Sequence, residues 1–182
     1  THSHTHTHTH PHTHNRITGY RLGISEKKNK RYTMVWCGVV WCGVVSIFLG
    51  DENKVFVIQV EHSMGQVIEM FLKEEEKERP MTHDLMLNVF RVFGVKVERA
   101  VITDLKSTTY YARLVLKQEN SLGQNIADID ARPSDCLALA VAQKRPIFVS
   151  RELFEQVDDM SEVLRQFNKG TQADEDAEDD ED

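Results

Sequence analysis

The chain of 182 residues contains few cysteines and little positive charge for its size. Its three cysteines, Cys37, Cys42 and Cys136, cannot build a dense disulfide framework. An odd number of cysteines is typical of a reducing compartment, so we expect a cytoplasmic protein. The net charge of −7 excludes a strongly basic domain that captures DNA through its overall field.

The chain also lacks a hydrophobic run of the length that spans a membrane. The mostly apolar stretch at 34–49 has 16 residues, whereas a membrane-spanning helix needs about 20. No small-residue cleavage site follows it, and its Val-rich second half favours a strand, so we expect no membrane partner and no export signal. Cys37 and Cys42 lie in a tandem WCGVV duplication without further zinc ligands, so we interpret them as packing residues or duplication products.

Common catalytic motifs are missing as well. The sequence contains no Walker loop and no GxGxxG, HExxH, GxSxG or paired CxxC motif. These absences remove most of the common enzyme classes. Any chemistry must therefore come from smaller clusters of polar residues.

The two ends of the chain hold most of what is unusual in the composition. Seven of the nine histidines lie in a Thr/His alternation over residues 1–14, and residues 171–182 contain eight acidic residues and no basic one. Neither segment can bury apolar surface. We predict a disordered extension at 1–33, one domain at 34–168 with its core at 44–157, and a disordered acidic tail at 169–182. Met34 is a candidate start of the protein.

Hydrophobic periodicity between the two ends predicts an α+β fold. Runs rich in β-branched residues predict strands at 44–49, 55–60, 95–105, 109–117, 126–130 and 146–149. A period of 3.6 predicts helices at 64–72, with a charged C-terminal continuation over 73–78 that ends before Pro80, at 85–93 and at 137–143, and more weakly at 151–156 and 161–168. The strand at 55–60 is apolar on both faces, so we expect it inside the sheet. The expected architecture is a single compact domain with a mixed or antiparallel sheet packed with helices.

A first polar cluster, Arg79-Pro80-Met81-Thr82-His83-Asp84-Leu85, stands at a predicted helix start. The hydroxyl of Thr82 can cap this helix, and Asp84 suits the positive end of its dipole. These structural roles do not explain Arg79 or His83. A histidine beside a carboxylate can act as a general acid or base.

A second polar cluster, at 128–135, stands where a predicted strand leads into a helix. Asp128 and Asp130 project from the same face of the strand, and Ser134 can cap the helix. Arg132 can pair with a carboxylate or a phosphate. The carboxylates could hold Mg²⁺ or Mn²⁺, which prefer oxygen ligands. Helix caps and a buried Arg–Asp pair explain the same residues without any chemistry.

At these two clusters the sequence resembles the bifunctional nuclease family, which is found mainly in bacteria. ERPMTHDL at 78–85 and DARPSDCLALA at 130–140 are similar to its PRPLTHDL and DARPSDAIALA signatures. Three shorter segments match in the same order: VITDL at 101–105, YYARLVL at 110–116 and PIFV at 146–149. The resemblance covers about 44–157. Its departures are Glu78, Met81, Cys136 and the stretch before Val44.

The resemblance implies a compact α+β domain, usually a homo-oligomer, that cleaves DNA and RNA. The matching positions are Arg79, Pro80, Thr82, His83, Asp84, Asp104, Asp130, Arg132, Pro133, Ser134 and Asp135. On this hypothesis Asp130 and Asp135, with Asp84 or Asp104, would hold Mg²⁺ or Mn²⁺. His83 would activate water or protonate the leaving group, and Arg79 and Arg132 would neutralise phosphate charge. Thr82, Asp104 and Ser134 would support the site.

Two other functions stay open. In a non-catalytic oligomeric or regulatory domain, the motifs would be capped helices, an Arg132–Asp84 ion pair and a histidine bonded to a backbone carbonyl. The mild acidity of residues 34–170 favours this alternative, because it gives little attraction to a polyanion. An enzyme for small phosphoesters would need the same metal site without an extended groove. The nuclease hypothesis requires the two clusters to meet in space.

Overall fold

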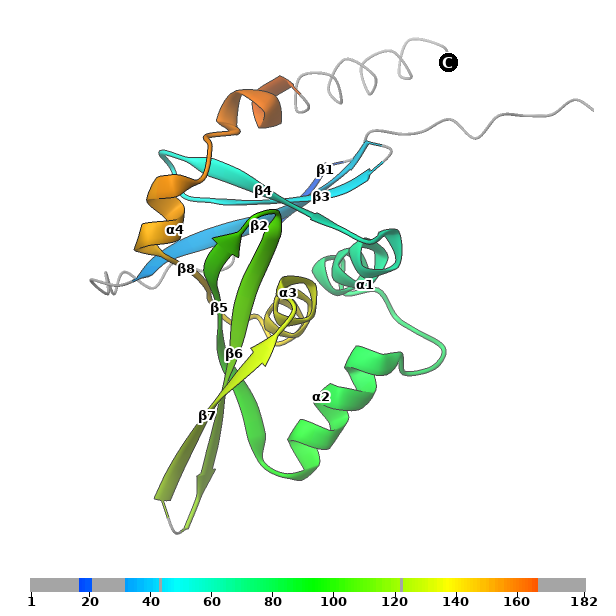
Figure 1. Ribbon diagram of the computed structural model, residues 1–182. Helices are drawn as coiled ribbons and strands as arrows, with labels where there is room; N and C mark the ends of the chain where they lie inside the picture. The colour runs from blue at the N-terminus through cyan, green and yellow to red at the C-terminus, as the bar shows by residue number, and fades with distance from the viewer. Residues whose placement is uncertain (1–16, 21–31, 43, 122, 167–182) are drawn as a thin grey trace, which may run out of the picture.

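The computed structural model describes residues 17–20, 32–42, 44–121 and 123–166, with side chains from Val45 onward. Its strands form one mixed sheet in the order β4-β3-β2-β8-β5-β6-β7, and β1 pairs with β2 (Figure 1). The strands are β1 Ile17–Tyr20, β2 Tyr32–Cys42, β3 Val44–Gly50, β4 Val55–Val60, β5 Val95–Lys106, β6 Thr109–Asn120, β7 Gly123–Ala131 and β8 Ile147–Ser150. Strands β5 and β8 run parallel, and the other pairs are antiparallel.

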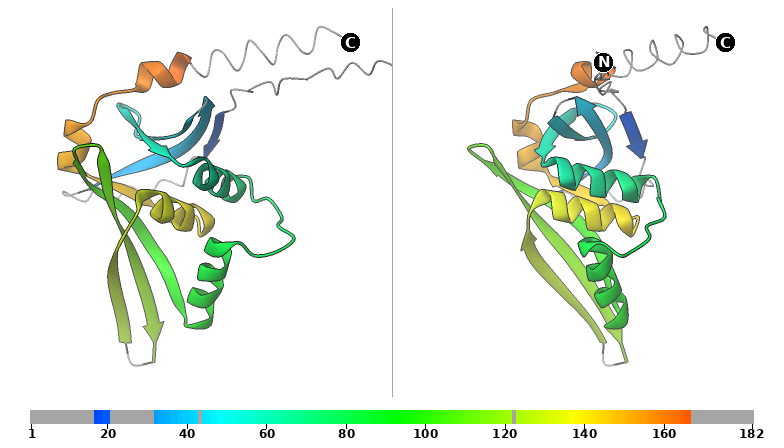
Figure 2. Two further views of the ribbon diagram at one scale, coloured as in Figure 1. Left: turned by 45° about the vertical axis from the view of Figure 1, so that its right-hand side comes forward. Right: turned by 90° about the vertical axis from the view of Figure 1, so that its right-hand side faces the viewer.

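Helices cover this sheet and complete the predicted α+β class, which is confirmed. They are α1 His62–Leu72, α2 Thr82–Val92, α3 Pro133–Ala142 and α4 Arg151–Gln156, and residues 161–166 are also helical. The predicted helical continuation over 73–78 is wrong, because the chain turns after Leu72 and Glu74 has a positive φ of 54°. Helix α3 packs against α1, β5 and β6, whereas α2 contacts β5 and α3. The two views in Figure 2 show α1 and α3 stacked together, with α2 beside the long β5–β6–β7 strands.

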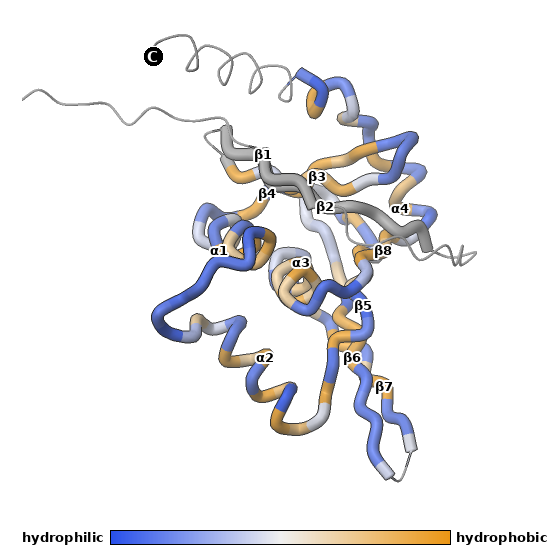
Figure 3. Tube along the Cα trace, turned by 180° about the vertical axis from the view of Figure 1, so that it is seen from behind, coloured by the Kyte–Doolittle hydropathy of each residue, from blue (hydrophilic) through white to orange (hydrophobic). Residues whose placement is uncertain are grey.

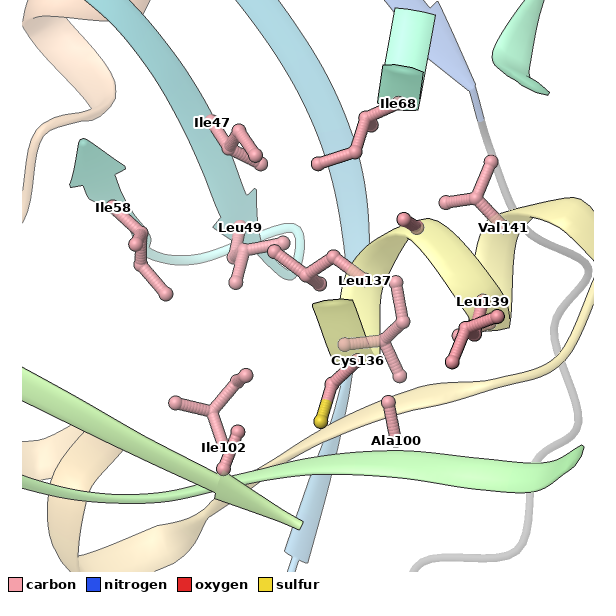
Figure 4. Packing of buried hydrophobic residues seen from close by; sticks show 14 of the residues in the cluster. Ile47, Leu49, Ile58, Ile68, Ala100, Ile102, Cys136, Leu137, Leu139 and Val141 are labelled. Atoms are coloured by element: carbon pink, nitrogen blue, oxygen red, sulfur yellow. The ribbon is translucent and has the colours of Figure 1, made fainter. Parts of the chain in front are cut away.

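Helix α3 lies in the centre of the core, as its apolar sequence predicts. Every residue from Cys136 to Val141 is buried, and the helix packs among side chains of the sheet and α1, including Leu49, Ile68 and Ile102 (Figure 4). Burial raises the pKa of the Cys136 thiol to about 12, so the thiol is neutral at physiological pH. Cys136 is a packing residue, and its departure from the family signature leaves the core intact.

Strand β4 is at the edge of the sheet, so the prediction of an interior strand is wrong. Among the described strands it pairs with β3 alone. Its second apolar face is covered by the C-terminal segment instead, because Val55 clusters with Phe48 and Leu164. The Met160 N–H donates to the Val55 carbonyl oxygen at 2.7 Å. The apolar residues on both faces of β4 thus indicate that both faces are buried. They do not indicate that β4 has a neighbouring strand at each edge.

Gly65 allows α1 to lie directly on β3. A Cβ at this position would lie 2.3 Å from Cγ1 of Val45. We expect Gly65→Ala to lower the free energy of unfolding by about 1 kcal/mol, because overpacking outweighs the gain in helix propensity. Urea denaturation measures this loss. The Gly65→Ala and Val45→Ala double variant should lose less than the sum of the single variants, and additive losses would contradict the close approach.

The sheet begins before Met34. Strand β2 begins at Tyr32, and β1 pairs with it in register, so the predicted disorder over 1–33 does not describe residues 17–20. The ITGY sequence of β1 favours a strand, although the surrounding segment is polar and basic. Residues 32 and 33 of the predicted extension belong to β2, whereas residues 1–16 and 21–31 and the acidic tail at 169–182 lie outside the described residues. No described helix has the length and apolar character needed to cross a membrane.

Candidate active site

The two polar clusters meet through the first turns of α2 and α3. Nε2 of His83 lies 3.0 Å from Oδ1 of Asp135, across 52 positions of the chain. His83 is 8% exposed and is the one buried polar residue among the side chains that the structure describes. It sits on the inner face of α2, which packs towards α3 and β5. The nuclease hypothesis requires the two clusters to be in contact, and in the structure they are.

Asp135 is held between His83 and Arg132. Nε of Arg132 donates to Oδ2 of Asp135 at 2.9 Å, while Oδ1 faces the imidazole. Burial alone would raise the pKa of Asp135, but the hydrogen bonds from Arg132 and His83 outweigh burial and lower it. The same hydrogen bond raises the pKa of Arg132. Asp135 is therefore an anion at neutral pH.

An anionic Asp135 selects one tautomer of a neutral imidazole at His83. A carboxylate can only accept hydrogen bonds, so a neutral His83 carries its proton on Nε2. Nδ1 is then left with a lone pair, and the structure gives His83 no second hydrogen bond within the described residues. A histidine oriented by a carboxylate and holding a free ring nitrogen is suited to accept a proton.

Asp84 faces away from this cluster. Its carboxylate accepts from Nζ of Lys77 at 2.9 Å and from the backbone N–H of Met81 at 2.9 Å. Burial tends to raise the pKa of Asp84, but these hydrogen bonds lower it overall. The predicted Arg132–Asp84 ion pair is wrong, because each residue has a different partner. The predicted bond from His83 to a backbone carbonyl is also replaced, by the bond to Asp135.

The helix caps differ from those predicted for Thr82 and Ser134. Helix α2 has Met81 as its N-cap, because Asp84 reaches back to the Met81 N–H. Helix α3 has Arg132 as its N-cap and Pro133 in the first helical turn. Thr82 and Ser134 therefore lie inside the helices that they were predicted to cap.

Asp128 and Asp130 point away from the His83–Asp135 pair. In the register of β6 and β7, Asp130 is opposite Arg113, and the next residue, Ala131, is opposite the buried Ala112. Because neighbouring side chains of a strand point to opposite faces, Asp130 projects from the face that is turned away from α3. Asp128 shares that face and binds Nε of Arg113 at 2.6 Å.

The predicted metal ligands do not form one set. No group of three or more His, Cys, Asp or Glu side chains within the described ranges has the geometry to hold a metal ion. Asp84 is paired with Lys77, Asp135 with Arg132, and Asp130 lies on the other face of the sheet. Asp104 lies on β5, where it contacts Lys106 at 3.3 Å. The donor set thus does not fit a metal site built from these four carboxylates.

The predicted phosphate-binding arginines are both at the surface. Arg132 has a side chain that is 61% exposed, and its Nη1 lies 4.0 Å from Oε1 of Glu61. Arg79 is exposed in the segment before α2, and the described residues provide it with no hydrogen bond or ion pair. Both guanidinium groups can therefore approach a dissolved anion.

Lys77 is a residue that the sequence did not single out. Its Nζ binds Asp84 and lies 3.7 Å from the ring centroid of Phe71. With Met70, Pro80 and Asn88, these residues line a pocket of about 480 Å³ that is bounded by α1, α2 and the C-terminal end of α3. The lysine belongs to the charged run KEEEKER, in which no pattern distinguishes one base from another.

Acid should weaken the fold through Asp84 and Asp135. Because the pKa of each is lower in the folded chain, their contribution is complete above about pH 5 and disappears as the pH falls through about 4 towards the folded pKa. We expect urea denaturation to give a lower free energy of unfolding at pH 3 than at pH 5. Asp84→Asn should lose less over this interval, and an equal loss would contradict the assignment.

The part of the chain that holds this cluster lies within a match to a known protein family. A family model described as the bifunctional nuclease domain matches residues 47–162. Two curated relatives from Mycobacterium tuberculosis are the uncharacterized proteins MT1877, from strain CDC 1551, and Rv1829, from strain H37Rv. Each is 35% identical over 81 residues, which cover 44% of this chain and 45% of the relative. The matched segment thus spans about half the length of these relatives.

Proposed function

Because the chain belongs to the bifunctional nuclease domain family, we propose that it is a nuclease that hydrolyses phosphodiester bonds of DNA and RNA. The observation that carries this proposal is the contact between Nε2 of His83 and Oδ1 of Asp135 at 3.0 Å. It joins the two sequence motifs in one cluster, with Arg132 on the other carboxylate oxygen. An acid–base group and an exposed cation side by side are what phosphodiester hydrolysis requires.

In the proposed reaction His83 acts as a general base through Nδ1. It takes a proton from water as the water oxygen forms a bond to phosphorus and the bond from phosphorus to the leaving oxygen breaks. Asp135 holds the ring and stabilises the imidazolium, which then returns the proton to the leaving oxygen. Arg132, and Arg79 from the neighbouring loop, neutralise the charge that develops on the phosphate oxygens.

The need for Mg²⁺ or Mn²⁺ stays a prediction, and no step above depends on it. The four carboxylates do not converge, but Mg²⁺ usually binds one or two carboxylates together with phosphate oxygens of the substrate. Asp130 is exposed and accepts no hydrogen bond from the described residues, but it lies on the face of the sheet that is turned away from His83. The cytoplasmic location likewise stays a prediction from the cysteine content.

A cleavage assay tests the proposal. Purified chain is incubated with single- and double-stranded DNA and RNA in Mg²⁺, in Mn²⁺ and in EDTA. We expect cleavage of both nucleic acids, and the EDTA arm measures the metal requirement separately. Absence of cleavage under every condition would contradict the proposal.

A non-catalytic regulatory domain is the second candidate. The observation that favours it is that Asp84 and Asp135 are both satisfied by partners within the chain. In that case substitutions in the cluster would change stability, while no cleavage would be found in the wild-type chain. The assay above therefore separates the two candidates.

A further inference from the structure

Lys77 stands in the middle of the segment that joins α1 to α2. Figure 3 shows this segment, residues 73–81, as a largely hydrophilic stretch between the two helices. A lysine in such a stretch is ordinarily at the surface, yet the side chain of Lys77 is only 14% exposed. Its Nζ lies 3.7 Å from the ring centroid of Phe71 on α1, and 3.0 and 2.9 Å from the two carboxylate oxygens of Asp84 on α2. Lys77 thus ties the two helices together.

Asp84 is held from two directions. Nζ of Lys77 binds its carboxylate from the side of α1, and Oδ2 also accepts from the backbone N–H of Met81 at 2.9 Å. The bond to Met81 closes the first turn of α2, whereas the bond to Lys77 fixes how that turn is rotated about the helix axis. The side chain of Asp84 is 23% exposed, so salt and water screen this pair less than a fully exposed one.

The rotation of the first turn decides where His83 points. Successive side chains of an α-helix are about 100° apart, so an Asp84 held towards α1 turns His83 towards α3. There Nε2 of His83 lies 3.0 Å from Oδ1 of Asp135. A side chain that stands about 5 Å from the helix axis moves by about 1.7 Å when the helix turns by about 20°. Such a displacement breaks a hydrogen bond, so the contact requires a fixed rotation.

The packing of α2 further along does not fix its first turn. Leu87 and Phe90 are half-buried and pack against the core, one or more turns after His83. The first turn of a helix has backbone N–H groups without intrahelical partners, and it frays unless side chains hold it. Asp84 and Lys77 are the side chains that hold it here.

We propose that Lys77 is a positioning residue, which acts through Asp84 to hold the imidazole of His83 against Asp135. Its ammonium group is bonded within the chain, and it makes no contact with substrate in this proposal. The expected changes in cleavage rate rest on the proposed nuclease function, whereas the placement of the ring can be measured without any cleavage.

NMR of the imidazole nitrogens tests the placement directly. In the wild-type chain the neutral His83 should be the tautomer with its proton on Nε2, bonded to Asp135. Lys77→Met keeps most of the side-chain length but removes the charge, and should give a mixture of both tautomers. Lys77→Arg should restore the single tautomer, because a guanidinium group binds a carboxylate and stacks on an aromatic ring. A wild-type tautomer in Lys77→Met would overturn the proposal.

Lys73→Met is the matched control for Lys77→Met. Nζ of Lys73 lies 2.7 Å from Oε1 of Glu69, and its side chain is 28% exposed, but this pair connects α1 only to its own C-terminal end. The control should keep the wild-type tautomer, and urea denaturation should show that all variants are folded. Equal loss of the tautomer in both methionine variants would mean that any disturbance of the segment displaces His83, and would contradict a specific role of Lys77.

Cleavage kinetics test whether the placement matters for catalysis. Lys77→Met should lower kcat about 10²-fold, the cost of a displacement of about 1 Å, and should change KM by less than about twofold. In the His83→Ala background the same substitution should cause no further loss, because Lys77 acts through His83. Losses that multiply would overturn the proposal. A wild-type chain that cleaves nothing would refute the nuclease function alone, since the tautomer comparison still decides the role of Lys77.

Discussion

Replacing Asp135 with asparagine is expected to lower the rate of DNA and RNA cleavage by about 10³-fold, because Asp135 both orients His83 and stabilises its charged form. An asparagine amide has no charge with which to stabilise an imidazolium, and its nitrogen can face the ring and favour the wrong tautomer. The loss of the charged hydrogen bond to the largely exposed Arg132 should also lower the free energy of unfolding, by about 0.5–1 kcal/mol.

Asp128→Asn is the matched control for Asp135→Asn. Asp128 forms the same type of pair, with Nε of Arg113 at 2.6 Å, but on the outer face of the β6–β7 hairpin. We expect this variant to keep cleavage within about threefold of the wild type, since the pair is exposed and remote from His83. If Asp135→Asn were folded and also cleaved within threefold of the wild type, the site would be wrong.

Replacing His83 with alanine should lower cleavage by about 10²- to 10⁴-fold, the range for loss of a general acid or base. The substitution leaves Asp135 paired with Arg132, so the anion does not become isolated. His62→Ala provides the control, because His62 is exposed at the start of α1 and is not part of the cluster. His62→Ala should retain full activity.

The readout must separate catalysis from folding, because His83 is buried. Thermal unfolding and urea denaturation measure the stability of His83→Ala, and single-turnover cleavage well below its unfolding midpoint measures chemistry. His83→Gln keeps much of the volume without a titrating ring and should be as inactive as the alanine variant. Activity restored by glutamine would mean that His83 has a structural role.

Much of the fold could be predicted from the sequence, since the relevant signals are local. The alternation over 109–117 and the apolar run from Cys136 to Ala142 predicted β6 and α3 directly. Strand β1 and the edge position of β4 could not be predicted. The first is a short β-favouring run inside a polar segment, and the second depends on packing by residues more than 100 positions away.

Which face of α2 turns towards the core could not be predicted either. Its apolar residues form a pattern typical of a helix that packs on a core, yet Leu85 and Phe93 face outward and the polar His83 faces inward. Periodicity gives the width of an apolar face but does not tell whether the cover comes from the same chain. This reversal brings His83 to Asp135 and leaves Leu85, Val92 and Phe93 exposed.

The residues of the candidate site were named from sequence, but their partners were not. Asp84 and Asp135 each stand in the first turn of a helix, so local rules give them similar roles. Long-range packing separates them, with Lys77 beside one and His83 beside the other. That Asp130 and Asp135 lie on different sides of the sheet likewise depends on the register in which β7 pairs with β6.

A double-mutant cycle on cleavage tests the central claim, that His83 and Asp135 act as one catalytic unit. Single-turnover rates are measured for the wild type, His83→Ala, Asp135→Asn and the variant with both changes. The account predicts that the double variant is no slower than the slower single variant, because either change already disables the pair. Losses that multiply, or single variants that cleave as fast as the wild type, would contradict it.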